Sequence, residues 1–450
     1  MFLLYDFIFL LYALIYLPFL LLTKRGYAGF GMRFGLFSPS VKKQIRAKAN
    51  IWVHAVSVGE VMVIDGFIDQ LKKIYPSYQF VVTVTTKTGY RLARERLKDK
   101  ALVIPSPVDF SFVAGVFVSL IDPKIYIAVE TEIWPNLYRQ LYLKKVPLVV
   151  INGRISDGSF GRYKAIRFLL KRVLNQVSIW CMQSPRDAQR IMDLGAESSR
   201  VVVTGNVKFD LLNGEDLTVP PLFYGSTSLT TSKEGVRGSF WWVAGSTHPG
   251  EEEIVLDVYS KIVKDNPRWR LVIAPRHIER APKIMELVAQ RGLKVVKLSA
   301  ISGFPTKTFG NDSGGSGFGN DKMGFVFGND NVVVVDTIGQ LRFLYSKASL
   351  VFVGKSLCVG GGHNIIEPAF YGRAIVIGPK FENFRDIVAC FKENNAIVQV
   401  EDAHAFEIRV RALCADASKR ETLGAAAREV IAANQGATKR ILERLVEFLK

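Results

Sequence analysis

Short apolar runs alternate with helical patterns from residue 51 onward, and this alternation predicts two series of βα units. Each run is bounded by Gly, Pro or Asp, which favours buried strands of a parallel sheet. The predicted strands of the first series are 51–56, 79–86, 101–106, 125–130, 147–152, 178–183 and 201–206, and those of the second are 240–246, 269–276, 332–337, 349–354, 374–379 and 396–400.

The chain of 450 residues exceeds what one hydrophobic core usually supports, so the two series predict two domains. We expect an α/β fold in which residues 25–210 and 239–450 each form a Rossmann-like, doubly wound domain. Residues 211–238 are rich in Gly, Pro, Ser and Thr and are interpreted as a linker. The last helix is a candidate to pack back on the first domain. Ligands are expected at the carboxyl ends of the strands, in a central cleft.

The first 24 residues predict a membrane anchor. Asp6 is the one charge in residues 1–22, and as a helix this stretch extends about 33 Å, which is enough to cross the hydrocarbon core. Basic residues follow it, so the rest of the chain is expected in the cytoplasm. An interfacial helix is the alternative, because Asp6 and Pro18 weaken a span and the tyrosines suit a headgroup boundary.

The formal net charge of +18 favours an anionic partner: nucleic acid, a phospholipid surface or a phosphorylated substrate. No nucleic-acid-binding motif is present, and the apolar N-terminus argues against nucleic acid. The four cysteines lack metal or disulfide spacing. The tetrapeptide FGND recurs at 309–312, 318–321 and 327–330, and we interpret it as an inert surface insertion rather than a calcium-binding array.

In the first series, HAVSVGE (54–60) ends a strand and begins a helix, with Ser57 and Gly59 in the turn where a substrate could approach closely. Glu60 could accept a proton from an attacking hydroxyl, or it could simply cap the helix N-terminus. Geometry leaves both interpretations open. Further strand exits carry VETEIWPN, NGRIS and GNVKFD, whose charged residues are candidates for substrate binding: Glu130, Arg154 and Lys208.

In the second series, the motifs predict a nucleotide site. AGSTHPGEE, with Ser246, offers backbone amides for an anion, and APRH adds Arg276 and His277 at a neighbouring strand exit. Three glycines, 360–362, precede a helix predicted to begin near residue 363 or 364. Free amides there would receive a phosphate, while Glu367 would accept the ribose hydroxyls.

Together, HAVSVGE, ETEIWPN, NGRIS, GNVKFD, AGSTHPGEE, APRH, VVDTIGQL and GGGHNIIEPA occur in an order that resembles the Kdo (3-deoxy-D-manno-oct-2-ulosonic acid) transferases. The resemblance covers nearly the whole chain, apart from the FGND insertion. It implies the GT-B fold, CMP-Kdo as donor and a lipid A precursor as acceptor. It also implies an N-terminal anchor at the cytoplasmic face of the inner membrane, and no cofactor or essential metal.

Carried over by motif, the resemblance implies that Glu60 is the general base of an inverting transfer. It places Glu130 and Lys208 in the active site. We also expect a monomer, and the net charge favours contact with an anionic membrane surface. The expected CMP-binding set comprises Ser246, Arg276, His277, Gly339, Leu341, Gly361, Gly362, Asn364 and Glu367.

Two other functions fit part of the pattern. One is a GT-B transferase or epimerase that uses a UDP-sugar, which the motifs of the second series do not exclude. The other is a non-catalytic, membrane-bound lipid-binding protein on a GT-B frame, against which the set Glu60, Arg276 and Glu367 argues.

Overall fold

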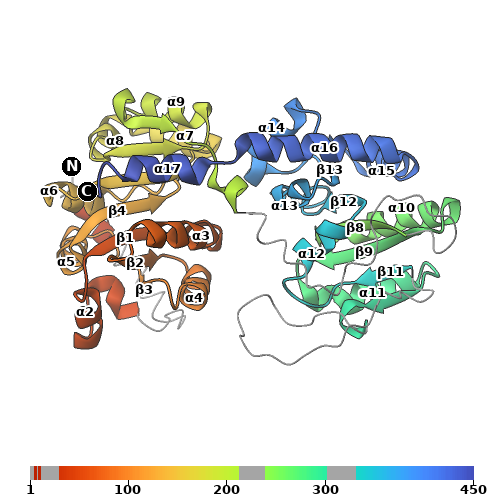
Figure 1. Cartoon of the computed structure of the whole chain (residues 1–450), viewed down its shortest axis with the longest axis horizontal. Helices are drawn as coiled ribbons and strands as arrows, with labels where there is room; N and C mark the ends of the chain where they lie inside the picture. Colours follow the sequence, from red (N-terminus) through yellow and green to blue (C-terminus); the bar gives the residue numbers. More distant parts are fainter. Residues whose placement is uncertain (1–4, 8, 12–29, 212–238, 302–330, 450) are drawn as a thin grey trace. The chain divides into compact units, whose positions relative to one another are not determined.

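The computed structural model describes residues 5–7, 9–11, 30–211, 239–301 and 331–449. The chain divides into an N-terminal unit, Met1–Leu211 with Asn434–Lys450, and a C-terminal unit, Leu212–Ala433 (Figure 1). Most of the predicted anchor (1–24), the linker (211–238) and the FGND insertion lies outside the described residues.

Each unit contains one parallel seven-stranded sheet. The N-terminal sheet has the order β3-β2-β1-β4-β5-β6-β7, and the C-terminal sheet has the order β10-β11-β9-β8-β12-β13-β14. The strands are β1 Asn50–Ala55, β2 Gln79–Val84, β3 Leu102–Pro105, β4 Pro123–Val129, β5 Leu148–Gly153, β6 Ile179–Met182, β7 Val201–Val203, β8 Phe240–Thr247, β9 Trp269–Pro275, β10 Val295–Lys297, β11 Val332–Val334, β12 Leu350–Val353, β13 Ala374–Ile377 and β14 Val398–Gln399.

Every predicted strand is present, and two parallel-sheet α/β domains fit the GT-B class. The pattern missed only β10 among the strands that the structure describes. That strand has three residues at a sheet edge, none of them buried, so it lacks the apolar run that marks the others.

Helices cover both faces of the N-terminal sheet. The elements of this unit are η1 Phe30–Phe34, α2 Pro39–Ile45, α3 Val58–Ile74, α4 Lys87–Arg96, α5 Ser111–Ile121, α6 Pro135–Leu143, α7 Asp157–Ala165, α8 Arg167–Leu174, α9 Pro185–Asp193, η2 Ser198–Arg200, η3 Val207–Asp210 and α17 Ala437–Leu445. The C-terminal unit contributes α10 Glu251–Asp265, η6 Ile278–Arg280, α11 Ala281–Ala289, η7 Leu298–Ala300, α12 Leu341–Lys347, α13 Ile366–Phe370, η8 Glu382–Phe384, α14 Arg385–Glu393, α15 Ala403–Ala415 and α16 Ala417–Asn434.

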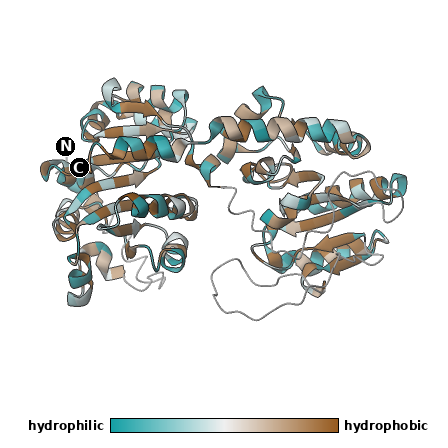
Figure 2. Cartoon of the chain, in the orientation of Figure 1, coloured by the Kyte–Doolittle hydropathy of each residue, from teal (hydrophilic) through white to brown (hydrophobic). Residues whose placement is uncertain are grey.

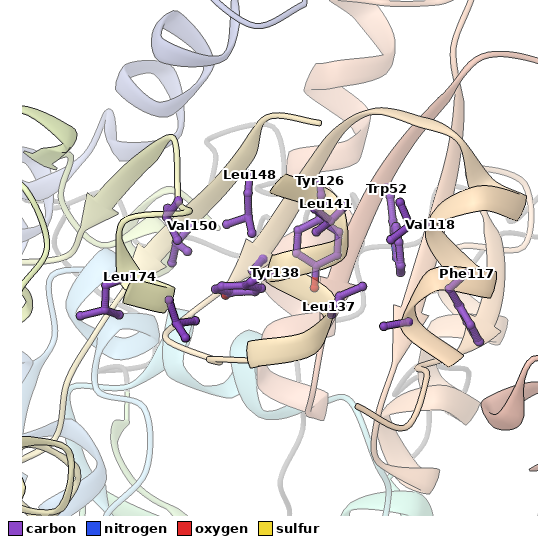
Figure 3. Close-up of a cluster of buried hydrophobic side chains, with 14 of the residues drawn as sticks. Trp52, Phe117, Val118, Tyr126, Leu137, Tyr138, Leu141, Leu148, Val150 and Leu174 are labelled. Carbon is purple, nitrogen blue, oxygen red and sulfur yellow. The ribbon is translucent and has the colours of Figure 1, made fainter. Parts of the chain in front are cut away.

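The N-terminal core has two layers because strand side chains alternate between the faces of the sheet. Trp52 and Tyr126 pack with Phe117 and Leu137 beneath α5 and α6 (Figure 3). The opposite face packs against α3, α4 and α17. Burial on both faces makes these strands apolar throughout, which Figure 2 shows as brown strands within more polar helices.

The last helix, α17, belongs to the N-terminal unit although it follows the whole C-terminal unit in sequence. Its Ile441 and Leu445 are fully buried with Val207 in the second core layer. Asp210 accepts hydrogen bonds from the amides of Gly436 and Thr438 at 2.7 and 2.6 Å. A carboxylate at a helix N-terminus is favourably placed, so these bonds fix the start of α17.

Among the residues described, no helix is both long and apolar enough to cross a membrane.

Candidate active site

Both sheets reverse their strand order at one point, and the candidate residues gather there. In the N-terminal unit β1 lies between β2 and β4, and in the C-terminal unit β8 lies between β9 and β12. The loops after β1 and β4, or after β8 and β12, run to opposite faces of their sheet, which opens a crevice at the carboxyl edge. Each unit therefore has one natural ligand position.

Several residues at the carboxyl edges of the two sheets have left-handed backbone conformation. Glu130 after β4, Asn152 at the end of β5, Ser246 in β8 and Lys355 after β12 have φ of 58°, 54°, 56° and 60°. Non-glycine residues adopt this conformation at a cost, and it persists where surrounding structure imposes it, often at functional sites. Both predicted residues in this set, Glu130 and Ser246, therefore have constrained positions.

Glu60 lies in the first turn of α3 and is 5% exposed. One carboxylate oxygen, Oε2, accepts the amide of Val56 at 2.7 Å. The other, Oε1, accepts the amide and hydroxyl of Ser57 at 3.1 and 2.8 Å. Glu60 and Ser57 thus form a capping box, which fixes the carboxylate at the carboxyl end of β1. Gly59, beside it in α3, is exposed.

Burial is the main cause that raises the pKa of Glu60 from 4.5 to about 7. The negative charges of Glu130 and Glu132 contribute to this rise, and the hydrogen bonds from Val56 and Ser57 oppose it. A carboxylate with a pKa near 7 is about half ionised at neutral pH, so it can accept a proton there and release it again. The two interpretations of Glu60, helix cap and proton acceptor, are therefore compatible in one side chain.

The other predicted residues of the N-terminal unit lie at the same edge. Lys208 Nζ lies 3.5 Å from Glu130 Oε1, which links the loop after β7 to the loop after β4. The amide of Arg154 donates to the hydroxyl of Thr131 at 2.8 Å, which ties the loop after β5 to the same place. Burial and the charge of Glu130 raise the pKa of Glu132, which the prediction did not include in the site.

The glycine loop of the C-terminal unit differs from the prediction. The amide of Gly361 donates to Glu382 Oε2 at 2.6 Å, and the amide of Gly362 donates to the carbonyl of Lys355 at 2.9 Å. The expectation that these amides are free for a phosphate is wrong. Their φ of 108° and 66° explains the glycines instead, because the loop needs left-handed backbone at both positions.

The helix after this loop also begins later than predicted. It is α13, Ile366–Phe370, and not a helix from residue 363 or 364. Asn364 Oδ1 accepts the amide of Ile366 at 3.1 Å, and such a local bond holds the backbone in a turn. Glu367 consequently lies in the first turn. Its pKa is raised by burial, against the charge of Arg342 and a hydrogen bond with Asn364.

A carboxylate of the chain itself occupies one amide of the AGSTHPGEE motif, that of His248, together with three amides of the loop after β12. Glu251, fully buried, accepts the amide of His248 at 3.0 Å and those of Lys355, Ser356 and Leu357 at 2.8, 3.0 and 3.0 Å. The His248 amide is therefore not open to an anion, because Glu251, the first residue of α10, folds back into the turn. Through these hydrogen bonds Glu251 joins the loop after β12 to the loop after β8.

The neighbouring Glu252 is also fully buried. Arg280 donates to both its oxygens at 2.6 and 3.1 Å, and the Thr247 hydroxyl donates at 2.8 Å. A bidentate pair of hydrogen bonds from a guanidinium offsets much of the desolvation cost of a buried carboxylate. Both acidic residues of the motif are therefore structural.

Cationic and imidazole side chains surround this crevice. The rings of His248 and His363 stack with centroids 5.6 Å apart, and His277 meets His248 edge-on at 5.9 Å. Burial is the main cause that lowers the pKa of His363 to about 4, and Arg276, His248 and Lys355 contribute to this shift. Arg276 is exposed at the end of β9. These neighbours create a positive potential, which suits a phosphate monoester.

The last two predicted residues, Gly339 and Leu341, flank the start of α12. Gly339 is exposed with φ of 92°. A Cβ on Gly245 in β8 would lie 2.9 Å from Leu341 Cδ1 and 2.1 Å from the Tyr345 hydroxyl, so Gly245 is what lets α12 approach the strand.

The sequence prediction omitted Lys355, His248 and His363. Lys355 lies two residues after the end of β12. A cation at a strand exit was the signal used for Arg154 and Lys208, so the same criterion would have found it. The two histidines are 115 residues apart, and only the fold brings their rings together.

Comparison with known proteins decides the family. The family model described as 3-deoxy-D-manno-octulosonic-acid transferase (kdotransferase) matches residues 28–211. The chain is 31% identical over 401 residues to the 3-deoxy-D-manno-octulosonic acid transferase of Haemophilus influenzae, covering 89% of this chain and 87% of that protein. The chain belongs to the 3-deoxy-D-manno-octulosonic acid transferase family.

Further relatives agree with this assignment. The Kdo transferase of Bordetella pertussis is 26% identical over 435 residues, with 93% of each chain covered. Two solved structures share the fold alone. UDP-GlcNAc 2-epimerase from Neisseria meningitidis has a TM-score of 0.59 at 14% identity, covering 88% of this chain and all of that one. MurG from Acinetobacter baumannii has a TM-score of 0.53 at 12% identity, covering 89% and 99%. The predicted resemblance to the Kdo transferases is confirmed.

Proposed function

We propose that this chain transfers Kdo from CMP-Kdo to a hydroxyl of a lipid A precursor in lipopolysaccharide synthesis, with inversion at the anomeric carbon. Membership of the Kdo transferase family supports the transferred sugar. The observation that carries the mechanism is Glu60, a fixed, buried carboxylate whose pKa is raised to about 7.

In this mechanism the acceptor hydroxyl oxygen forms a bond to the anomeric carbon of Kdo. The bond from that carbon to the phosphate oxygen of CMP breaks, and CMP leaves with the electron pair. Glu60 takes the hydroxyl proton through Oε2, which accepts one hydrogen bond, from Val56, and has a further lone pair. Lys208, close to Glu130, supplies positive charge for acidic groups of the substrates.

CMP leaves as a phosphate monoester dianion, so its departure needs positive charge. Arg276 and Lys355 provide it at the crevice of the C-terminal unit, beside His363, with Ser246, Gly339 and Leu341 along the same edge. Glu367, in the first turn of α13, is the acceptor for the ribose hydroxyls. Because side-chain cations serve the phosphate, we propose that no metal or cofactor is required.

We further propose that the chain acts as a monomer at the cytoplasmic face of the inner membrane, where its net charge of +18 favours anionic lipid.

An assay of Kdo transfer tests this function. Purified full chain is mixed with CMP-Kdo and a tetra-acylated lipid A precursor, and the product is identified by mass. Glu60→Ala should reduce transfer at least about a hundredfold, because a positioned general base contributes that much or more. CMP should still protect Glu60→Ala from thermal unfolding.

Glu197→Ala is the matched control, because it removes an exposed carboxylate that pairs with Arg200 in the same unit. It should leave transfer unchanged. Transfer by Glu60→Ala near the wild-type rate would refute the base assignment. Absence of a Kdo-containing product from the wild type would refute the function.

A further inference from the structure

Two histidines of the C-terminal unit lie in contact at the carboxyl edge of its sheet. The Nε2 atoms of His248 and His363 are 3.4 Å apart, and the rings stack with centroids 5.6 Å apart and planes 21° apart. When both rings are neutral, one carries its hydrogen on Nε2 and donates it, and the other carries its hydrogen on Nδ1 and accepts. We call His248 and His363 the histidine pair.

Backbone hydrogen bonds hold the two ends of the histidine pair together. His248 follows β8, whereas His363 follows the glycine loop after β12. Glu251 accepts the amides of His248 and Lys355 at 3.0 and 2.8 Å, which joins the two loops. The carbonyl of Lys355 accepts the amide of Gly362, the residue before His363, at 2.9 Å. The contact between the rings is therefore fixed by the backbone on both sides.

The surroundings of the histidine pair disfavour a proton on it. The titratable and charged groups that act on the pair come from the loops after β9 and β12, from η6 and from α10: Arg276, His277, Lys355, Arg280 and Glu251. Burial is the largest cause, and it lowers the pKa of both rings, that of His363 to about 4. The positive groups act in the same direction, and Glu251 opposes them at His248. The pair is therefore neutral at physiological pH.

An anion at this edge would reverse that balance. Both rings are partly exposed, as is Lys355, and Arg276 is exposed, so a ligand can reach all four side chains. A negative charge about 4 Å from an imidazole in a partly buried site increases its affinity for a proton about a thousandfold. An increase of that size is enough to move a pKa from about 4 to about 7.

We propose that His248 and His363 act as one proton-binding site, which takes up a proton from solvent when the phosphate of CMP binds at the crevice of the C-terminal unit. The inference rests on the CMP site of the proposed function. In the charged pair one ring is an imidazolium, and the other is neutral and accepts one of its hydrogens. An imidazolium has a hydrogen on each ring nitrogen, so a second hydrogen is available for a phosphate oxygen.

This proton supports the departure of CMP. The phosphate of CMP-Kdo is a diester with a single negative charge, and it becomes a monoester dianion when the bond to the anomeric carbon breaks. The electron pair of that bond stays on the phosphate oxygen. The imidazolium offsets the added charge through a charge-assisted hydrogen bond, and release of CMP returns the proton to solvent.

Calorimetry measures the proton uptake. Full chain is titrated with CMP at pH 7.0 in buffers of different ionisation enthalpy, at a pH where free CMP is mostly a dianion. Wild type should take up at least about half a proton per CMP. His248→Phe and His363→Phe keep a ring for stacking but remove the shared hydrogen, so uptake should fall at least about fivefold in each.

The matched control is His404→Gln, which removes an exposed histidine of α15 in the same unit and should keep the wild-type uptake. Uptake at the wild-type level in either pair variant, or CMP binding by wild type without uptake, would overturn the shared site and leave the proposed function standing. Failure of wild type to bind CMP would overturn the proposed CMP site together with this inference.

Nitrogen NMR of the full chain with isotope-labelled histidine tests the same claim without a substitution. At pH 7.0 the signals of His248 and His363 should be those of neutral imidazoles in the free protein. With saturating CMP the two rings together should gain the signature of one imidazolium. Rings that stay neutral in the CMP complex would refute the proposal, even where the phenylalanine variants do not fold.

Discussion

Because folding raises the pKa of Glu60, we predict that the free energy of unfolding depends on pH, whether or not Glu60 is catalytic. The folded pKa of about 7 exceeds the ordinary value of 4.5, so the fold binds the proton more tightly than the unfolded chain does. The stability due to this group is complete below pH 4.5 and is lost as the pH rises to about 7. The difference between the two values corresponds to about 3 kcal/mol.

Glu60→Gln cannot ionise and therefore avoids this loss. We expect the free energy of unfolding of Glu60→Gln, relative to wild type, to increase by about 3 kcal/mol between pH 4.5 and a pH above 7. Burial raises the pKa of Asp109 to about 6 in the same window, but Asp109 is present in both proteins and cancels in the difference.

Urea unfolding of both proteins at several pH values measures this difference, and limited proteolysis identifies the transition of the N-terminal unit. A difference that does not change with pH would refute the claim that burial raises the pKa of Glu60. The same value predicts that kcat/KM rises about tenfold per pH unit below pH 7 and then levels, if Glu60 is the base.

Three further predictions concern the C-terminal unit and the absence of a metal. In Glu251→Gln, the side-chain NH2 group would face backbone N–H donors, so we expect thermal unfolding to show a loss of about 3–5 kcal/mol of stability. The exposed control Glu286→Gln should show no loss. A loss under about 1 kcal/mol in Glu251→Gln would contradict a stabilising role for these hydrogen bonds. Arg276→Ala should weaken CMP binding at least about tenfold in calorimetry, and the exposed Lys283→Ala should leave it unchanged; equal affinity would remove Arg276 from the phosphate site. Transfer should persist in excess EDTA, and a loss that Mg²⁺ restores would show that a metal is required.

The local pattern was enough to place the strands, because a strand buried on both faces must be apolar wherever it lies in the sheet. It also placed Glu60, Glu130 and Arg276 at strand exits, where parallel sheets bind ligands. The glycine loop was misread for a specific reason. A run of glycines indicates unusual backbone, but which carboxylate or carbonyl its amides meet depends on residues far away, here Glu382 for Gly361.

The hydrogen-bond partners of Glu251 were likewise not predictable from the residues beside it. Its position at the start of α10 was readable as an ordinary acidic first turn, yet three of its four amide donors come from a loop more than a hundred residues later. Asp6 was interpreted only as a weak point in a membrane helix, because its partners Ser111 and Asn136 are brought to it by folding.

The sequence by itself thus determined the two sheets, the edge at which each carries its chemistry, and the family. Only the tertiary structure decided how acidic Glu60 is, which amides are already occupied, and where the first charged residue is held. Periodicity and strand exits are properties of neighbouring residues, whereas desolvation, charge proximity and hydrogen-bond partners arise from side chains that meet only when the chain folds.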